Sequence, residues 1–215
     1  ALAPGPGSRT ILFITTWRRY LPSRVLAGQG RRTDEFEGSA YQRFTSSLLQ
    51  STRLHQILEL HDHQLLFLPH HNLADQFHHV RPASDRVQVL EPTGDDIQRL
   101  VRTCDVFVTD HSSVHFDAAY LGKPVIYARF DREEYESRHA APSWFDVERE
   151  GYGPVTETLE GTLDELERVL TGGCVQEQVY RERIERLLTY HDHQNAQRLL
   201  EAIEARLAER AEALR

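Results

Sequence analysis

Residues 104–117 read CDVFVTDHSSVHFD, and this stretch decides the fold. The run Val106–Val108 is apolar at consecutive positions, as expected for a strand that is buried on both faces of a parallel sheet. Small polar residues end the run, and helical spacing begins near Ser113. A strand, a polar turn and a helix in this order predict one unit of an α/β domain.

Four more short apolar runs flank this stretch, at residues 11–14, 65–68, 87–90 and 125–127. Segments with helical spacing separate the runs, and one of them, before the second run, predicts a helix of roughly twenty residues. Because crossovers of this length connect parallel strands, the pattern predicts a doubly wound, Rossmann-like parallel sheet.

Beyond the fifth run the sequence predicts smaller elements and then two C-terminal helices. These are one or two helical turns at 131–138, an ordered loop at 142–154, a helix at 162–170, and two helices across 176–215 that break near 191–195. The chain therefore divides into a linker or artificial boundary at 1–9, a nucleotide-binding domain at 10–175, and helices at 176–215 that pack on the same domain. The apolar runs are far shorter than the ~20 residues that span a bilayer.

Composition excludes several classes of function. A formal charge of −8 argues against a protein that coats nucleic acid, although it leaves room for one local phosphate pocket. Two cysteines, Cys104 and Cys174, are too few for a disulfide framework. Four histidine pairs suggest zinc, but neither a His-Glu-x-x-His helix nor alternating cysteines accompany them, so no metal site is predicted. The pairs are His61/His63, His70/His71, His78/His79 and His191/His193.

The polar turn after Val108 is the first candidate site. In open α/β sheets, ligands bind at the carboxyl ends of strands, where free N–H groups at a helix start favour an anion. Ser112 and Ser113 add hydroxyl donors without bulk, but Asp110 or Ser112 could instead cap the helix. The residues alone leave a cap and a phosphate site equally open. A serine hydrolase is not indicated, because neighbours along one turn rarely converge as a triad and no Gly-x-Ser-x-Gly elbow is present.

The same stretch resembles a family signature. TDHSSV at 109–114, followed by FD at 116–117, is similar to the Thr-Asp-Tyr-Ser-Ser-x-x-Phe-Asp signature of the CDP-glycerol glycerophosphotransferases, the teichoic-acid polymerases and primases. The likeness covers roughly residues 10–155 as an ordered series. It includes ILFITTWR at 11–18, LFLPH at 66–70, GKPVIY at 122–127, DREEY at 131–135, FDVE at 145–148 and GYGPV at 151–155.

This resemblance implies a fold and an activity. Family members have a two-domain GT-B glycosyltransferase architecture, of which this chain would be the C-terminal, nucleotide-binding half. They transfer a polyol phosphate from a CDP-linked donor such as CDP-glycerol to a teichoic-acid or capsule-type polymer or to a lipid-linked acceptor, and no cofactor is required. The resemblance also implies a cytoplasmic protein, with work at the inner face of the cell membrane left open. The general base would belong to an N-terminal domain outside this chain.

The resemblance also implies which residues form the donor site. Arg18 would supply cationic charge as the cytidylate leaves. His70 is the catalytic candidate, since a histidine at a strand end could protonate or hydrogen-bond the departing phosphate oxygen. The expected donor- and phosphate-binding residues are Thr16, Arg18, Thr109, Asp110, Ser112, Ser113, Asp117 and Glu134.

Three departures from the family pattern and two other functions stay open. His111 replaces the tyrosine of the serine motif, Thr15 replaces the proline before Thr16, and Leu68 replaces a cation two residues before His70. A GT-B sugar transferase or nucleotide-sugar epimerase that uses a UDP-sugar would share this half-fold. A nucleotide-binding module without catalysis would share it as well.

Overall fold

The computed structural model describes residues 9–21, 35–77, 80–91, 96–139 and 144–213. Its centre is a six-stranded sheet in the order β3-β2-β1-β4-β5-β6, and all neighbouring strands are parallel. The doubly wound Rossmann-like sheet is thus confirmed. The strands are β1 (Thr10–Ile14), β2 (Gln64–Leu68), β3 (Val87–Val89), β4 (Val106–Thr109), β5 (Val125–Ala128) and β6 (Val155–Thr156).

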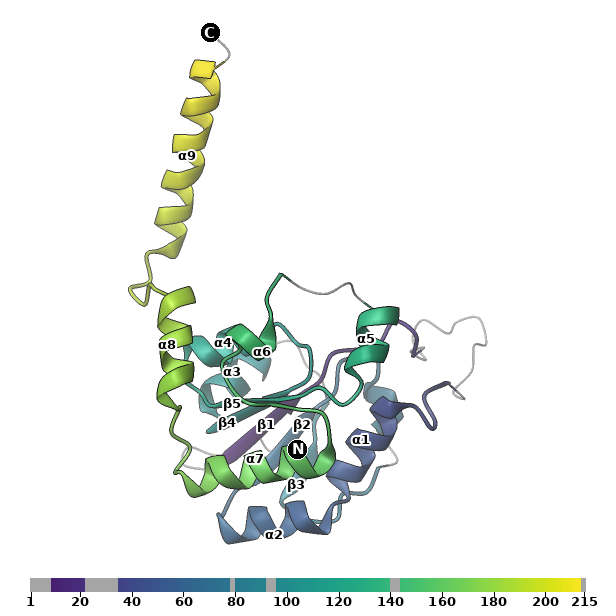
Figure 1. The fold of residues 1–215 in the computed structure, drawn as a ribbon. Coiled ribbons are helices and arrows are strands. Elements are labelled where there is room, and N and C mark those ends of the chain that lie inside the picture. The colour runs from purple at the N-terminus through teal and green to yellow at the C-terminus, as the bar shows by residue number, and fades with distance from the viewer. Residues whose placement is uncertain (1–8, 22–34, 78–79, 92–95, 140–143, 214–215) are drawn as a thin grey trace.

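Helices cover both faces of this sheet (Figure 1). One face carries α1 (Ala40–Leu49), α2 (Thr52–Leu60) and α7 (Leu159–Thr171), and the other carries α3 (Asp96–Thr103), α4 (His115–Tyr120) and α8 (Gln178–Leu187). Alternate residues of β1 show why the apolar runs are continuous. Ile11 and Phe13 enter the first core cluster, whereas Leu12 and Ile14 enter the second. Both faces of each central strand are therefore buried.

The predicted twenty-residue helix is two helices, α1 and α2. Ser51 separates them, because its side chain accepts a hydrogen bond from the Leu54 N–H at 3.1 Å and so begins a new helix. Three more elements were not predicted, and the first of them is the short 3-10 helix η2 (Ala74–Phe77). The strand β6 has two residues, too few for a sequence pattern, and α6 (Val147–Glu150) lies inside the expected loop.

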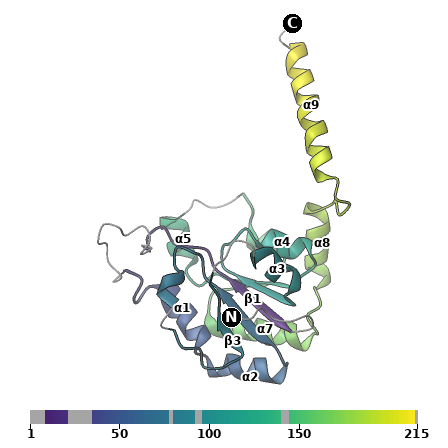
Figure 2. The same ribbon diagram turned by 180° about the vertical axis from the view of Figure 1, so that it is seen from behind.

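The two C-terminal helices differ in how they contact the domain. Helix α8 packs through Ile184, and Arg183 Nη1 donates a hydrogen bond to the Gly151 carbonyl oxygen at 2.9 Å. Helix α9 (Asn195–Ala213) instead projects away from the sheet, as both views show (Figures 1 and 2). Its apolar side chains, including Leu199 and Leu207, are exposed. The expectation that both helices pack on the domain is therefore wrong for α9.

Among the described residues, no helix has the length and apolar character needed to cross a bilayer.

The sheet order places one crevice at its centre. The chain winds from β1 toward β3 on one side and from β4 toward β6 on the other, so the direction reverses between β1 and β4. At such a reversal the loops after the two central strands diverge, and ligands bind between them at the carboxyl ends. The residues that follow Ile14 and Thr109 are therefore placed at the position where this fold binds ligands.

Candidate functional site

The sheet register brings the strand ends of the candidate site together. Ile14 pairs with Leu68 on one side and with Thr109 on the other, and Thr109 pairs with Tyr127. The segments that follow these residues contain Thr16 and Arg18 after β1, His70 after β2 and Asp110 after β4. Three segments that are far apart in sequence thus meet at the carboxyl end of the sheet.

Arg18 is fully buried and holds this edge together. Its Nε and Nη2 donate to the two Asp131 carboxylate oxygens at 2.6 and 2.9 Å, and Nη2 also lies 2.9 Å from Asp110 Oδ2. The guanidinium carbon lies 5.0 Å from the Tyr41 ring centre and 4.7 Å from that of Tyr135. Because two carboxylates and aromatic rings enclose it, Arg18 does not present its charge to the crevice. The expected contact with a leaving cytidylate is replaced here by a structural role.

Arg18, Asp110 and Asp131 form a buried cluster, and electrostatic interactions within it keep Arg18 and Asp131 charged. Burial lowers the pKa of Arg18, but Asp110 and Asp131 outweigh burial and raise that pKa above its usual value. Burial opposes ionisation of Asp131, yet His111 and Arg18 outweigh it and lower the pKa of Asp131 to about 2. A buried ion pair costs desolvation, so it persists only where hydrogen bonds satisfy both partners. The bidentate Arg18–Asp131 geometry meets this condition.

Asp110 orients the serine turn and does not cap α4. Its carboxylate accepts hydrogen bonds from the Thr16 N–H at 2.9 and 3.1 Å and from the His111 N–H at 2.5 Å. Helix α4 begins at His115 and spans six residues, and its N-cap, Val114, has no side-chain cap. The capping alternative for Asp110 is therefore wrong. Asp110 joins the end of β1 to the turn after β4.

The serine turn borders a cavity. Ser112 is half-buried and Ser113 is exposed, and among the described residues neither backbone N–H of these serines donates a hydrogen bond. Ser113 lines a cavity of about 470 Å³, a size within the range of small-molecule sites. Other parts of its wall come from Arg129, Arg132, Tyr135, Trp144 and Phe145. The turn thus faces open space with unused donors.

His70 lies after β2 with its ring partly exposed. Its Nδ1 accepts a hydrogen bond from the Asn72 N–H at 3.2 Å. Burial, followed by the neighbouring His71, lowers the pKa of His70 to about 4. The imidazole is therefore neutral at pH 7, and its proton lies on Nε2 because Nδ1 is the acceptor. His70 can donate a hydrogen bond to an oxygen but is a poor cationic acid.

The remaining expected residues divide into buried and peripheral ones. Thr109 is buried, and its hydroxyl donates to the Ile14 carbonyl oxygen at 2.8 Å, which joins β1 and β4. The Thr16 hydroxyl oxygen is buried without a hydrogen-bond partner among the described residues. Asp117 is exposed on α4. Glu134 lies on α5 (Arg132–Arg138) and accepts from Arg138 Nη1 at 2.7 Å, so the structure does not bring it into the turn.

The three departures from the family pattern each have a local structural partner. The His111 ring stacks on Tyr135, with ring centres 3.7 Å apart and planes 4° apart. The Thr15 hydroxyl and the Tyr41 hydroxyl are 2.5 Å apart and share a hydrogen bond. Leu68 is buried in the second core cluster. No cation therefore stands at position 68.

Sequence reasoning missed Asp131 and Arg129 as members of this site. Arg129 is 9% exposed, its Nη2 donates to Glu136 at 2.9 Å, and its Nε has no partner among the described residues. Both residues follow β5, which itself follows β4 in the sheet. Their position immediately after a buried run was the available signal, since the carboxyl ends of parallel strands share one edge.

Acid sensitivity is expected from His115, which is 6% exposed beside Tyr127. Burial lowers the pKa of His115 to about 4, whereas an unfolded histidine titrates near pH 6.5. Between these values the unfolded chain binds a proton that the folded chain does not. The free energy of unfolding should therefore fall as the pH drops from about 6.5 to 4, by up to ~1.4 kcal/mol per pH unit for this group. Urea denaturation across this range measures the slope. His115→Phe should reduce it, and an unchanged slope would contradict the assignment.

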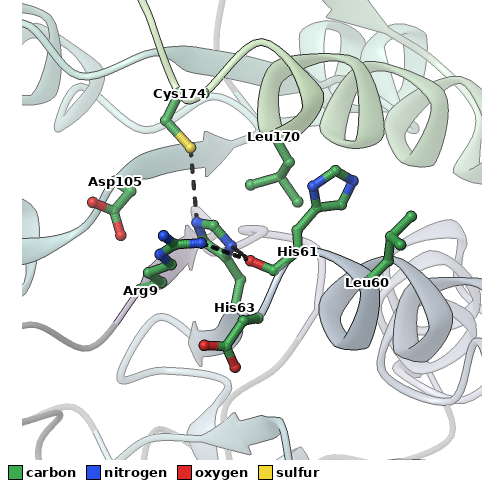
Figure 3. A pocket seen from close by; sticks show the side chains of 9 residues that line it. Arg9, Leu60, His61, His63, Asp105, Leu170 and Cys174 are labelled. Atoms are coloured by element: carbon green, nitrogen blue, oxygen red, sulfur yellow. Dashed lines mark hydrogen bonds between the residues drawn. The ribbon is translucent and has the colours of Figure 1, made fainter.

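A second cavity, of about 370 Å³, lies at the end of the sheet where the strands begin (Figure 3). Arg9 and Asp105, which precede β1 and β4, line it together with His63 and Cys174. Cys174 Sγ lies 3.7 Å from His63 Nε2, and burial raises the pKa of the Cys174 thiol. A raised thiol pKa opposes formation of the reactive thiolate. This cavity is at the amino ends of the strands, away from the serine turn.

Within the described ranges, no three His, Cys, Asp or Glu side chains converge in a way that could hold a metal ion. Of the four histidine pairs, His78 and His79 lie outside the described residues.

The family of the chain follows from its sequence as a whole. The model of the CDP-glycerol:poly(glycerophosphate) glycerophosphotransferase family matches residues 3–205. The chain belongs to this family. The resemblance seen in the serine motif is therefore confirmed over nearly the whole length of the chain.

Curated relatives of this glycerophosphotransferase family member are teichoic-acid proteins. The minor teichoic acid biosynthesis protein GgaB of Bacillus subtilis (strain 168) is 27% identical over 204 residues, which cover 94% of this chain and 22% of the relative. A teichoic acid poly(glycerol phosphate) polymerase of the same organism is 27% identical over 75% of this chain and 19% of the relative. The chain thus spans about a fifth of the length of these relatives.

Solved structures agree on the fold. The wall teichoic acid polymerase TagF superposes with a TM-score of 0.57 at 20% identity, over 96% of this chain and 46% of that chain. A candidate UDP-N-acetylglucosamine 2-epimerase from Listeria monocytogenes gives a TM-score of 0.55 at 18% identity, over 94% and 46%. At these identities the likeness establishes the fold alone. The chain has the Rossmann-like half of a GT-B fold.

Proposed function

We propose that this chain is the donor-binding domain of a glycerophosphotransferase that builds a teichoic-acid-type polymer. Its donor would be a CDP-activated polyol phosphate such as CDP-glycerol, with the diphosphate against Ser112 and Ser113. The observation that carries the proposal is the serine turn at the reversal of the sheet order. The backbone N–H groups of Ser112 and Ser113 form no hydrogen bond among the described residues, and the turn opens on a cavity of about 470 Å³. Membership of the family supports CDP-glycerol as the donor.

The proposed reaction is a phosphoryl transfer. The acceptor hydroxyl oxygen bonds to the phosphorus of the polyol phosphate, and the bond from that phosphorus to the oxygen of the cytidylate breaks. Cytidine monophosphate leaves with the electron pair, and the acceptor proton passes to a base supplied by a part of the enzyme outside this chain. Fixed hydrogen-bond donors stabilise the negative charge that develops on the leaving oxygen. Ser112, Ser113 and the neutral His70 would supply them.

The buried cluster fits this proposal as a positioning device. Asp110 holds the turn through the His111 N–H and holds the end of β1 through the Thr16 N–H. Arg18 in turn fixes Asp110 to Asp131. The donors of the turn would therefore be in place before the ligand arrives, which is the condition for electrostatic stabilisation of a transition state.

The acceptor and the second half of the enzyme belong to the proposal too. The acceptor would be the growing polymer or a lipid-linked primer, brought to the same edge of the sheet by a partner domain. The reaction would take place in the cytoplasm, at the inner face of the cell membrane, as the resemblance to the family implies. The proposed reaction requires no metal and no cofactor.

Calorimetry tests the proposed donor site. We expect the chain to bind CDP-glycerol and CMP more tightly than UDP. The double variant Ser112→Ala/Ser113→Ala should bind CDP-glycerol at least tenfold more weakly, because a hydrogen bond to a charged group contributes about 1.5–3 kcal/mol. Ser47→Ala, an exposed serine on α1, is the matched control.

Other outcomes would favour other functions. Selectivity for uridine nucleotides would favour a UDP-sugar transferase or epimerase-like domain, with which the chain shares its fold. Binding that survives the double serine variant unchanged would exclude the two hydroxyls as donors to the diphosphate and leave only the backbone N–H groups of the turn in that role. Absence of any nucleotide binding by the wild type would contradict the proposal.

A further inference from the structure

A row of five aromatic rings runs along the carboxyl-end edge of the sheet. The His70 ring centre lies 6.1 Å from that of Trp17, and Trp17 meets His139 edge-on at 5.1 Å. His139 stacks on Tyr135 at 4.6 Å, and Tyr135 stacks on His111 at 3.7 Å. The row begins after β2, passes the end of β1, and reaches the serine turn by way of α5.

Two imidazoles in this row are held by backbone N–H groups. The Asn72 N–H donates to His70 Nδ1 at 3.2 Å, and the Arg19 N–H donates to His139 Nδ1 at 2.8 Å. A neutral imidazole has one donor and one acceptor nitrogen. Because Nδ1 is the acceptor in both rings, the proton of each neutral ring lies on Nε2. Both rings therefore carry a fixed Nε2–H donor on either side of Trp17.

The surroundings of both rings favour this neutral form. Both side chains are half-buried, and burial is the main cause that lowers the pKa of His70 and of His139. His71 acts in the same direction on His70, and Arg18 and Arg19 act so on His139. Asp110 opposes these shifts without reversing them. In the described part of the chain, no carboxylate forms an ion pair with either ring.

We propose that His70 and His139, with Trp17 between them, bind the polyol phosphate unit that is transferred, through the Nε2–H of each ring. This inference rests on the proposed function and adds Trp17 and His139 to it. The serine turn would hold the phosphate that leaves with the cytidine, His70 would donate to the oxygen at which the bond to the transferred phosphorus breaks, and His139 would hold the phosphate oxygens and polyol hydroxyls of the other half. The Trp17 ring, which contacts both imidazoles, would set the spacing between their two donors. Neutral donors suit this task, because they bind the unit without an ion pair that would slow its release.

Comparison of two ligands isolates this subsite. CDP-glycerol contains the transferred unit, whereas CMP does not. We expect His139→Ala to weaken CDP-glycerol binding by about tenfold and to leave CMP binding unchanged, since one hydrogen bond to a charged group is lost. His139→Gln keeps an N–H donor at this position and should lose less. His55→Ala, on α2, is the control for removal of a partly exposed imidazole. Equal affinity of wild type and His139→Ala for CDP-glycerol would overturn the proposal.

A second measurement separates this proposal from the donor assignment. Nitrogen-15 spectra of the wild-type imidazoles should show Nε2–H tautomers for His70 and His139, and glycerol 3-phosphate should shift both sets of resonances. This result would support the subsite even if CDP-glycerol did not bind, in which case the proposed donor alone would fail. Tautomers with the proton on Nδ1, or no response of His139 to glycerol 3-phosphate, would overturn the inference.

Discussion

Arg18→Met is expected to destabilise the domain by about 3–5 kcal/mol, because it leaves two buried carboxylates without their cation. Asp110 and Asp131 both have fully buried side chains, and Arg18 pairs with each of them. The methionine side chain fills similar space but offers no donor. Urea denaturation at pH 7 measures the loss. The same variant should weaken donor binding, because Asp110 also orients the serine turn.

Two further variants make this result specific. Arg53→Met removes an arginine that pairs with Glu160, Asp164 and Glu167 on the surface, and it should change stability far less. Arg18→Lys keeps the charge but not the bidentate geometry, so it should recover only part of the loss. If Arg18→Met and Arg53→Met unfolded at the same urea concentration, the stabilising role of the buried cluster of Arg18, Asp110 and Asp131 would be contradicted.

Gly153→Ala is expected to have an effect of similar size. A Cβ at Gly153 would lie 1.6 Å from the Val125 carbonyl oxygen and 2.5 Å from its carbon, so the backbone of β5 would have to move. Well-packed interiors resist such displacement, and we expect a loss of at least about 3 kcal/mol. Thermal and urea unfolding measure it.

Gly172→Ala is the matched control for this clash. A Cβ there would meet its nearest atoms at 3.4 and 3.5 Å, which is ordinary contact. Its stability should stay close to that of the wild type. If the two alanine variants were equally stable, the close approach of residue 153 to β5 would not exist in solution.

The main features of the fold could be predicted because parallel strands have continuous apolar runs. All five runs became strands, since residues such as Ile11 and Leu12 are buried on opposite faces of the sheet. The break at Ser51 was not predicted, because the apolar spacing continues across it while the hydroxyl begins a new helix. The position of α9 could not be predicted either. Its amphipathic pattern indicates a helix but does not say whether anything covers the apolar face.

The candidate site was predictable in its place and less so in its roles. The end of a buried strand located the serine turn, and the family resemblance supplied Arg18 and His70. That Arg18 is enclosed depends on Asp131, which is 113 residues away in the sequence. A sequence shows neither which charges neutralise one another nor which tautomer a histidine adopts. His139 and Trp17 were missed for the same reason, since only the folded chain brings their rings together.

The buried ion pairs of Arg18 with Asp110 and Asp131 limit how the serine motif could be transferred to another protein. Residues 109–117 do not hold their own shape, since Asp110 needs the Thr16 N–H and Arg18, and Arg18 needs Asp131. A graft of the motif onto another scaffold would lack Thr16, Arg18 and Asp131, which are distant in the sequence and hold Asp110 in place. The smallest unit that could be transferred is therefore the carboxyl end of the sheet together with the loops after β1, β4 and β5. The short sequence signature identifies this unit but does not hold its shape alone.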